Sequence, residues 1–106
     1  MINAVFFRNK NKNVCGFKIT NHGKEIVCAA VSALTINTVN SIERLASGNI
    51  EYRFDEHGGY IEATVPKLAE DGEDIKTQLL LDSLELGLLE IVKEYPKEIK
   101  ISYTNK

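Results

Sequence analysis

The sequence predicts an α+β domain in which two helices pack on one face of a mostly antiparallel sheet. Two observations support this prediction. Four short stretches alternate apolar and polar residues with the period of a strand, and a fifth, residues 2–8, is rich in β-prone residues; two longer stretches repeat apolar residues at helical spacing. Their order along the chain is ββαββαβ, so two hairpins and a last strand can form one sheet with both helices on one side.

The first two strands form a predicted hairpin. Residues 2–8 are rich in β-branched and aromatic side chains, residues 9–13 are a polar turn, and residues 14–20 alternate strictly. Cys15 shares its side of the second strand with Phe17 and Ile19. We therefore expect Cys15 to be a small buried residue of the core.

The first helix is predicted to begin near Glu25 and to end at Ser47-Gly48, where the glycine fits a C-cap. An apolar stripe at helical spacing supports this prediction, and it consists of Val27, Ala30, Val31, Leu34, Ile42 and Leu45. A second hairpin follows, with strands over 50–55 and 60–65 and a glycine-rich turn between them. His57 belongs to that turn, and we expect it to be exposed.

After Pro66, a polar connection is expected to lead into a second helix, which begins between Asp71 and Asp74 and stops at Tyr95-Pro96. Residues 99–103 form the last strand. The predicted core face of this helix consists of Ile75, Leu79, Leu80, Leu84, Leu88, Ile91 and Val92. Three further leucines make this apolar face wider than packing on the sheet requires, namely Leu81, Leu86 and Leu89. We therefore expect part of the face to pack against a second copy of the chain in a homodimer.

Length and composition limit the function classes. A chain of 106 residues is expected to form a single domain over 1–106. The net charge is −2 and the chain has no run rich in Lys or Arg, so direct nucleic-acid binding is not expected. We expect no membrane span and no signal peptide, and therefore a cytoplasmic protein.

The cysteines and histidines do not match a metal site. Cys15 and Cys28 are not a CxxC pair, and His22 and His57 lie in unrelated turns. We therefore expect no metal, no other cofactor and no structural disulfide. Cys28 also has no second cysteine nearby that could form a disulfide with it, so a thiol redox protein is the least favoured function.

His22 and Cys28 together predict a nucleophile and its base. Cys28 lies in the first turn of the predicted helix, where backbone N–H groups stabilise a thiolate, and His22 precedes it by six residues. An imidazole within reach could act as general base and then as general acid. Ser32, one turn after Cys28, could donate a hydrogen bond. Alternatively, Cys28 is small because the helix packs closely on a neighbour.

A resemblance to a known family favours catalysis. Thr20-Asn21-His22 and the segment Glu25–Ala33 (EIVCAAVSA) resemble the T-G-H-A element and the Cys-containing helix start of the ribosomal-processing cysteine proteases called Prp. Further matches are Thr38-Val39-Asn40-Ser41, Gly58-Gly59-Tyr60 and the helix end at Glu94-Tyr95. The resemblance covers nearly the whole chain.

The resemblance implies a specific activity. Such proteases remove a short N-terminal extension from a large-subunit bacterial ribosomal protein. On this basis Cys28 is the nucleophile, His22 is its base, and Glu25 and Ser32 support the site. The chain differs from the family pattern in having Asn21 before the histidine and in a shorter His–Cys separation, which opens the possibility of a more open site or a weaker enzyme.

Two alternatives remain open. In a second alignment register, His22-Gly23 matches another His-Gly that some relatives carry just before the Cys motif, and this chain then has no catalytic histidine. The alternative function is a non-catalytic ribosome-associated or RNA-binding module, because a fold does not determine a function.

Overall fold

The computed structural model describes residues 1–46, 49–71 and 74–106. Its elements are, in chain order, β1 (Ile2–Arg8), β2 (Val14–Thr20), α1 (Glu25–Leu45), β3 (Glu51–Phe54), β4 (Tyr60–Thr64), α2 (Pro66–Asp71), α3 (Ile75–Glu94) and β5 (Ile99–Asn105). The predicted order of strands and long helices is confirmed, and the short helix α2 is an addition to it.

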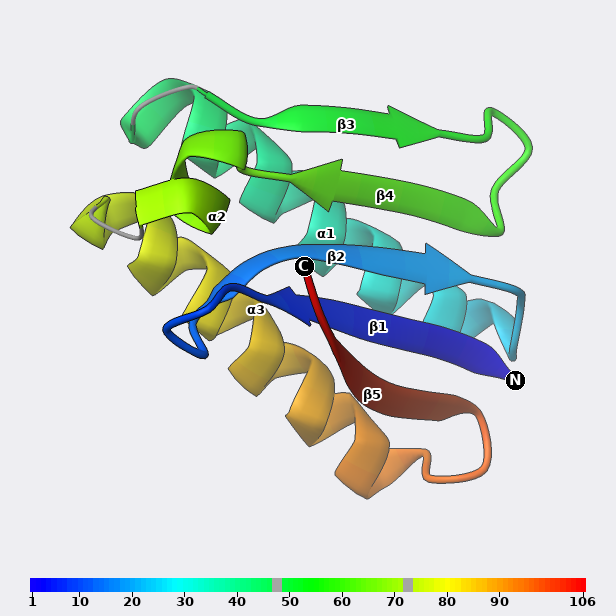
Figure 1. Cartoon of the computed structure of the whole chain (residues 1–106). Coiled ribbons are helices and arrows are strands. Elements are labelled where there is room, and N and C mark those ends of the chain that lie inside the picture. Colours follow the sequence, from blue (N-terminus) through cyan, green and yellow to red (C-terminus); the bar gives the residue numbers. More distant parts are fainter. Residues whose placement is uncertain (47–48, 72–73) are drawn as a thin grey trace.

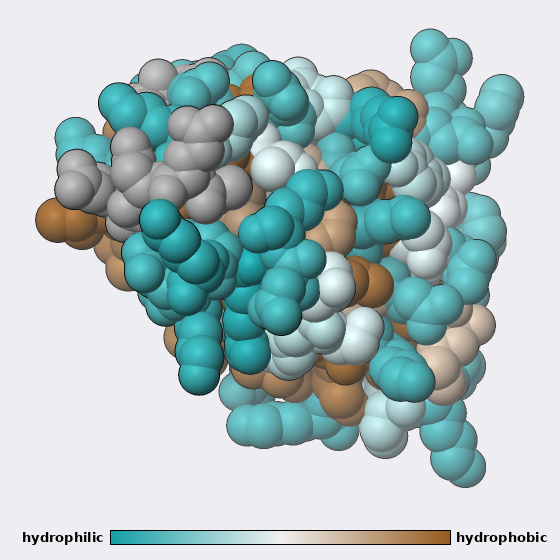
Figure 2. All heavy atoms as spheres, viewed as in Figure 1, coloured by the Kyte–Doolittle hydropathy of each residue, from teal (hydrophilic) through white to brown (hydrophobic). Residues whose placement is uncertain are grey.

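The five strands form one sheet in the order β3-β4-β2-β1-β5. β1 and β5 run parallel, and the other neighbouring pairs are antiparallel. Figure 1 shows α1 and α3 together behind the sheet, whereas no long helix of the described part of the chain covers its front face. That open face is mainly hydrophilic (Figure 2), as expected for an antiparallel sheet with one solvated side. The predicted α+β fold is therefore confirmed.

The core lies between the sheet and the two long helices. Phe6 and Phe17 from neighbouring central strands are fully buried in it, and so is Cys15, as expected. The contribution of α3 differs from the prediction, because Ile75 and Leu79 are 83% and 67% exposed.

The buried stripe of α3 consists of Thr77, Leu81, Leu84 and Leu88. Leucine occurs at so many positions of this helix that helical spacing alone did not fix which stripe faces the sheet. The polar side chain of Thr77 can be buried in the core because its hydroxyl donates a hydrogen bond to the carboxylate of the N-cap residue Asp74 at 2.8 Å. The predicted start between Asp71 and Asp74 agrees with the structure, in which Asp74 is the N-cap residue and its side chain accepts from the N–H of Thr77.

One connection also differs from the sequence prediction, and one predicted helix end lies outside the described residues. The polar connection predicted after β4 begins with α2, in which Pro66 takes the first position, where its missing N–H costs nothing. Buried Leu68 anchors α2, and its carbonyl accepts a hydrogen bond from the Asn9 side chain at 2.9 Å. α1 ends at Leu45; Ser47 and Gly48, the expected helix end and cap, lie outside the described residues.

Contrary to the expectation from the sequence, α1 is long and apolar enough to cross a membrane by length and composition alone, with a mean hydropathy of 1.4. In the fold, however, Val27, Val31, Val39 and Ile42 of α1 are part of the buried core. A core helix of a globular domain has the same composition, and the packing of α1 agrees with that role.

Candidate active site

A four-residue loop connects β2 to α1 and is held by the β3–β4 turn. Asn21 adopts a left-handed backbone with φ of 71°, a conformation that asparagine tolerates better than most residues. Its N–H donates to the carbonyl oxygen of Gly59 at 3.0 Å. The chain therefore reverses at the end of β2 and enters α1 after only Asn21, His22, Gly23 and Lys24.

Cys28 lies in the first turn of α1, where its N–H donates to the carbonyl oxygen of Lys24 at 2.9 Å. Its side chain is half-buried. The sulfur accepts a hydrogen bond from the N–H of Gly23 at 3.3 Å, and the thiol can donate to the Gly23 carbonyl oxygen at 3.5 Å. The short loop therefore brings the backbone of Gly23, the residue after His22, within hydrogen-bond distance of the sulfur.

His22 is exposed, and its imidazole lies against the β3–β4 turn. A Cβ atom built on Gly58 would be 3.6 Å from Cε1 of His22, and one built on Gly59 would overlap the ring. Among the described residues, the hydrogen-bond partner of the Cys28 sulfur is Gly23 and not His22. The structure thus brings the loop backbone to the sulfur and the imidazole to the turn.

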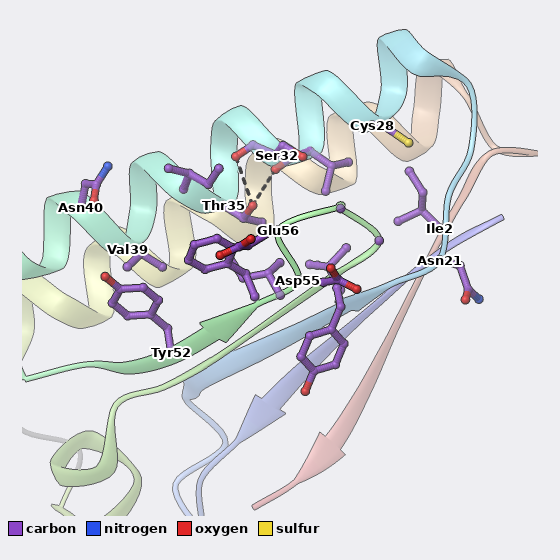
Figure 3. A pocket seen from close by; sticks show the side chains of 18 residues that line it. Ile2, Asn21, Cys28, Ser32, Thr35, Val39, Asn40, Tyr52, Asp55 and Glu56 are labelled. Carbon is purple, nitrogen blue, oxygen red and sulfur yellow. Dashed lines mark hydrogen bonds between the residues drawn. The ribbon is translucent and has the colours of Figure 1, made fainter.

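Glu25 and Ser32 lie on different parts of the same helix. Glu25 is exposed in the first turn of α1 and is not one of the residues that line the pocket described below. Ser32 lines that pocket with Cys28, one helical turn further along. The hydroxyl of Thr35 donates to the carbonyl oxygens of Val31 and Ser32, which fixes this part of the pocket wall (Figure 3).

A cavity of about 480 Å³ lies between α1 and the sheet. Figure 3 shows Cys28 at one end of it, and Asn40 and Tyr52 at the other. The apolar side chains Ile36, Tyr52 and Phe54 line it, although they are 52%, 43% and 61% exposed. Such an apolar cleft with a few polar groups is typical of a ligand site.

From the sequence, an extended peptide is expected either beside the sheet edge or in a groove between the second hairpin's turn and the first helix. The groove observed here is lined by those two elements and also by β3, whose alternation puts Tyr52 and Phe54 on the same side of the strand. The charged side chains that line the groove are acidic, Asp55 and Glu56, from the β3–β4 turn. Asp55 also shapes that turn, since its carboxylate accepts from the N–H of His57 at 2.9 Å.

The neighbouring side chains of β3 and β4 form a separate hydrogen-bond network. Arg53 donates two hydrogen bonds to Glu62, which lowers the pKa of the Glu62 carboxyl. The Tyr60 hydroxyl donates to the same carboxylate at 2.8 Å, which raises the pKa of Tyr60. Tyr60 therefore stays protonated at neutral pH and is not a candidate base.

Glu98 anchors the loop from the far end of the sequence. Its carboxylate accepts from the N–H of Lys24, the N-cap residue of α1, at 2.7 Å, and its carbonyl oxygen accepts from the N–H of Ile2 at 2.8 Å. A carboxylate at this position satisfies a backbone donor and interacts favourably with the helix dipole. Glu98 therefore holds the end of the loop that precedes Cys28.

We expect Glu98→Ala to lower the free energy of unfolding by about 1 kcal/mol, because the N–H of Lys24 loses its hydrogen-bond acceptor. Glu98→Gln retains an acceptor oxygen and is expected to recover at least half of that loss. Urea unfolding followed by circular dichroism measures both. Equal stabilities for the alanine and glutamine variants would contradict this role of the carboxylate oxygen.

Comparison with known proteins relates this site to a family. The family model described as cysteine protease Prp matches residues 1–100. The ribosomal processing cysteine protease Prp of Bacillus subtilis is 28% identical over 108 residues, with 96% of each chain covered. The protein of the same name from Staphylococcus aureus is 30% identical over 82 residues, which cover 77% of this chain and 74% of the relative.

Solved structures show the same fold. The S. aureus protease Prp with a covalently linked product peptide superposes with a TM-score of 0.87 at 28% identity, covering 98% of this chain and 100% of the other. The S. aureus enzyme with a substrate peptide gives a TM-score of 0.85 at 26% identity, with the same coverage. With a family match over nearly its whole length, the chain belongs to the cysteine protease Prp family.

Proposed function

We propose that the chain is a cysteine endopeptidase that removes the N-terminal extension of a large-subunit bacterial ribosomal protein. In this proposal, Cys28 is the nucleophile and His22 the general base, while Ser32 and Glu25 support the site. The observation that carries the proposal is the position of Cys28. Its sulfur lies in the first turn of α1, at the end of an open apolar groove.

The dimensions of the groove suit an extended peptide. Its lining residues on α1 run from Cys28 to Asn40, a distance of about 18 Å at the rise of an α-helix. An extended chain of about five residues has the same length. The S. aureus relatives were solved with a product peptide and a substrate peptide, which agrees with a peptide as the ligand here.

The proposed reaction proceeds through a thioester. His22 takes the proton of the Cys28 thiol, and the thiolate attacks the carbonyl carbon of the scissile peptide bond. His22 then protonates the leaving amine, which departs with the C-terminal part of the substrate. Finally, His22 deprotonates a water molecule that attacks the thioester, releasing the new carboxyl terminus and restoring Cys28. The N–H of Gly23, 3.3 Å from the sulfur, is our candidate donor to the oxyanion.

The direct test is to mix the purified chain with a ribosomal protein that retains its N-terminal extension and to determine the product masses. The proposal predicts two products whose masses sum to that of the substrate plus one water. The same ribosomal protein without the extension is the control and should stay intact. An extended substrate that remains whole under conditions in which the chain is folded would contradict the proposal.

The groove also yields a prediction for affinity. Ile36→Ser removes an apolar side chain from the groove, and we expect the KM for the extended substrate to rise about tenfold, the equivalent of about 1.4 kcal/mol of lost apolar contact. Ile26 is the matched control, because it is an exposed isoleucine of the same helix that does not line the groove. If Ile26→Ser and Ile36→Ser raised the KM equally, the groove would not be the peptide site.

The proposal includes a homodimer and a cytoplasmic location, where ribosomes are assembled. The exposed apolar residues Ile75, Leu79 and Leu86 lie on α3 and are 83%, 67% and 63% exposed. We expect light scattering of the purified chain at micromolar concentration to give twice the mass of one chain, and Leu79→Glu to give the monomer. A monomeric mass for the unchanged chain would contradict the homodimer without affecting the proposed reaction.

A further inference from the structure

We infer that Gly59 is a positioning residue for His22, because its backbone, bare of a side chain, forms the surface on which the imidazole lies. The effect of Gly59 on catalysis rests on the proposed function, whereas the placement of the His22 ring against Gly59 is independent of it. Two observations support the inference, one steric and one a hydrogen bond.

The steric observation concerns the space beside Gly59. A Cβ atom at this residue would overlap the His22 ring at Nε2, and it would also lie 3.0 Å from Cε1 and 3.2 Å from Cδ2. All three of its nearest neighbours are therefore atoms of one imidazole. The ring occupies the space in which any other residue would carry its side chain.

The hydrogen bond fixes the loop to the same glycine. The N–H of Asn21, the residue before His22, donates to the carbonyl oxygen of Gly59 at 3.0 Å. The backbone that carries the imidazole and the surface beneath it are thus held by one residue of the turn. Gly59 and Cys28 both line the groove, so the residue that positions the imidazole shares this groove with the thiol.

Gly58 provides a matched control for backbone strain. The two glycines have nearly the same left-handed conformation, with φ of 83° at Gly58 and 80° at Gly59. A Cβ atom at Gly58 would lie 3.6 Å from Cε1 of His22, which is an ordinary contact. Alanine at either position therefore strains the turn to a similar extent, but only Gly59→Ala displaces the imidazole.

The first readout is the environment of the ring. The chain contains two histidines, so the imidazole resonances can be assigned with His57→Gln. We expect Gly59→Ala to shift the His22 resonances markedly and Gly58→Ala to leave them near their original positions. Gly59→Asn serves as a second variant, because asparagine tolerates a left-handed backbone and still carries a Cβ atom.

The second readout is cleavage of the extended ribosomal protein. We expect Gly59→Ala and Gly59→Asn to lower kcat at least about tenfold, within the range that a general base contributes. Gly58 also lines the groove, so Gly58→Ala measures the effect of backbone strain and of an added methyl group there, and it is expected to lower kcat less than Gly59→Ala does. Adding Gly59→Ala to His22→Ala should have no further effect, because the displaced base is already absent.

The two readouts separate the inference from the proposed function. Unchanged His22 resonances in Gly59→Ala and Gly59→Asn, or equal losses of activity in Gly58→Ala and Gly59→Ala, would overturn the positioning role. If the unchanged chain cleaves nothing while the resonances of the Gly59 variants shift as expected, the proposed function fails and the placement of His22 stands.

Discussion

Replacing Cys28 with alanine is expected to abolish cleavage of the extended ribosomal protein and to leave the fold intact. The acyl-enzyme route needs the sulfur as its nucleophile, so we expect kcat to fall at least about 10⁴-fold, a loss typical of nucleophile removal. The fold should survive because Cys28 is only half-buried and its sulfur makes two weak hydrogen bonds to Gly23. Product masses measure the activity, and circular dichroism measures the fold.

Cys15 is the matched control for this substitution. It is fully buried, and burial raises the pKa of its thiol, so it is a poor nucleophile. Cys15→Ala should lower stability by about 1 kcal/mol because it leaves a small cavity, and the folded protein should keep its activity. Cleavage by the Cys28→Ala variant would end the proposal that this sulfur attacks the peptide.

Replacing His22 with alanine is expected to lower kcat by about 10² to 10⁴-fold, the usual contribution of a general acid–base residue. Because the His22 side chain is exposed, its removal should change the free energy of unfolding by less than about 0.5 kcal/mol. His57→Ala is the control, since His57 is also an exposed turn histidine, and it should retain full activity. Initial rates at saturating substrate give kcat for the unchanged chain, His22→Ala and His57→Ala.

An active His22→Ala variant would favour the second alignment register, in which this chain lacks the catalytic histidine. Another group would then have to take the thiol proton. Complete inactivity of both the variant and the unchanged chain would instead favour the non-catalytic ribosome-associated module. The magnitude of the His22 effect therefore distinguishes these interpretations.

Much of the fold could be predicted because its signals are local. The β-prone composition of β1, the alternation in β2 and the helical spacing from Glu25 onward are properties of residues close together in the sequence. The position of Cys28 in the first turn of α1 followed from the same spacing. By contrast, the buried stripe of α3 depends on how that helix is rotated against the sheet, and its many leucines did not determine this.

The rest of the site depends on contacts between distant parts of the chain. Glu98 binds the N–H of Lys24 although the two residues are 74 positions apart. The imidazole of His22 lies on Gly59 because the β3–β4 turn reaches the end of β2, as the pairing of Thr20 with Tyr60 shows. No local pattern encodes such proximity. The sequence therefore indicated the proposed reacting groups but not the surfaces that hold them.

The most direct measurement is the rate at which iodoacetamide alkylates Cys28 as a function of pH, with the labelled residue identified by mass spectrometry. If His22 takes the proton of the thiol, labelling of the unchanged chain should be fast near neutral pH, and labelling of His22→Ala should be slower at the same pH. Buried Cys15 should stay unlabelled in both and report that the fold is intact. A Cys28 that reacts only after denaturation, or whose pH profile is identical in the two proteins, would contradict the account.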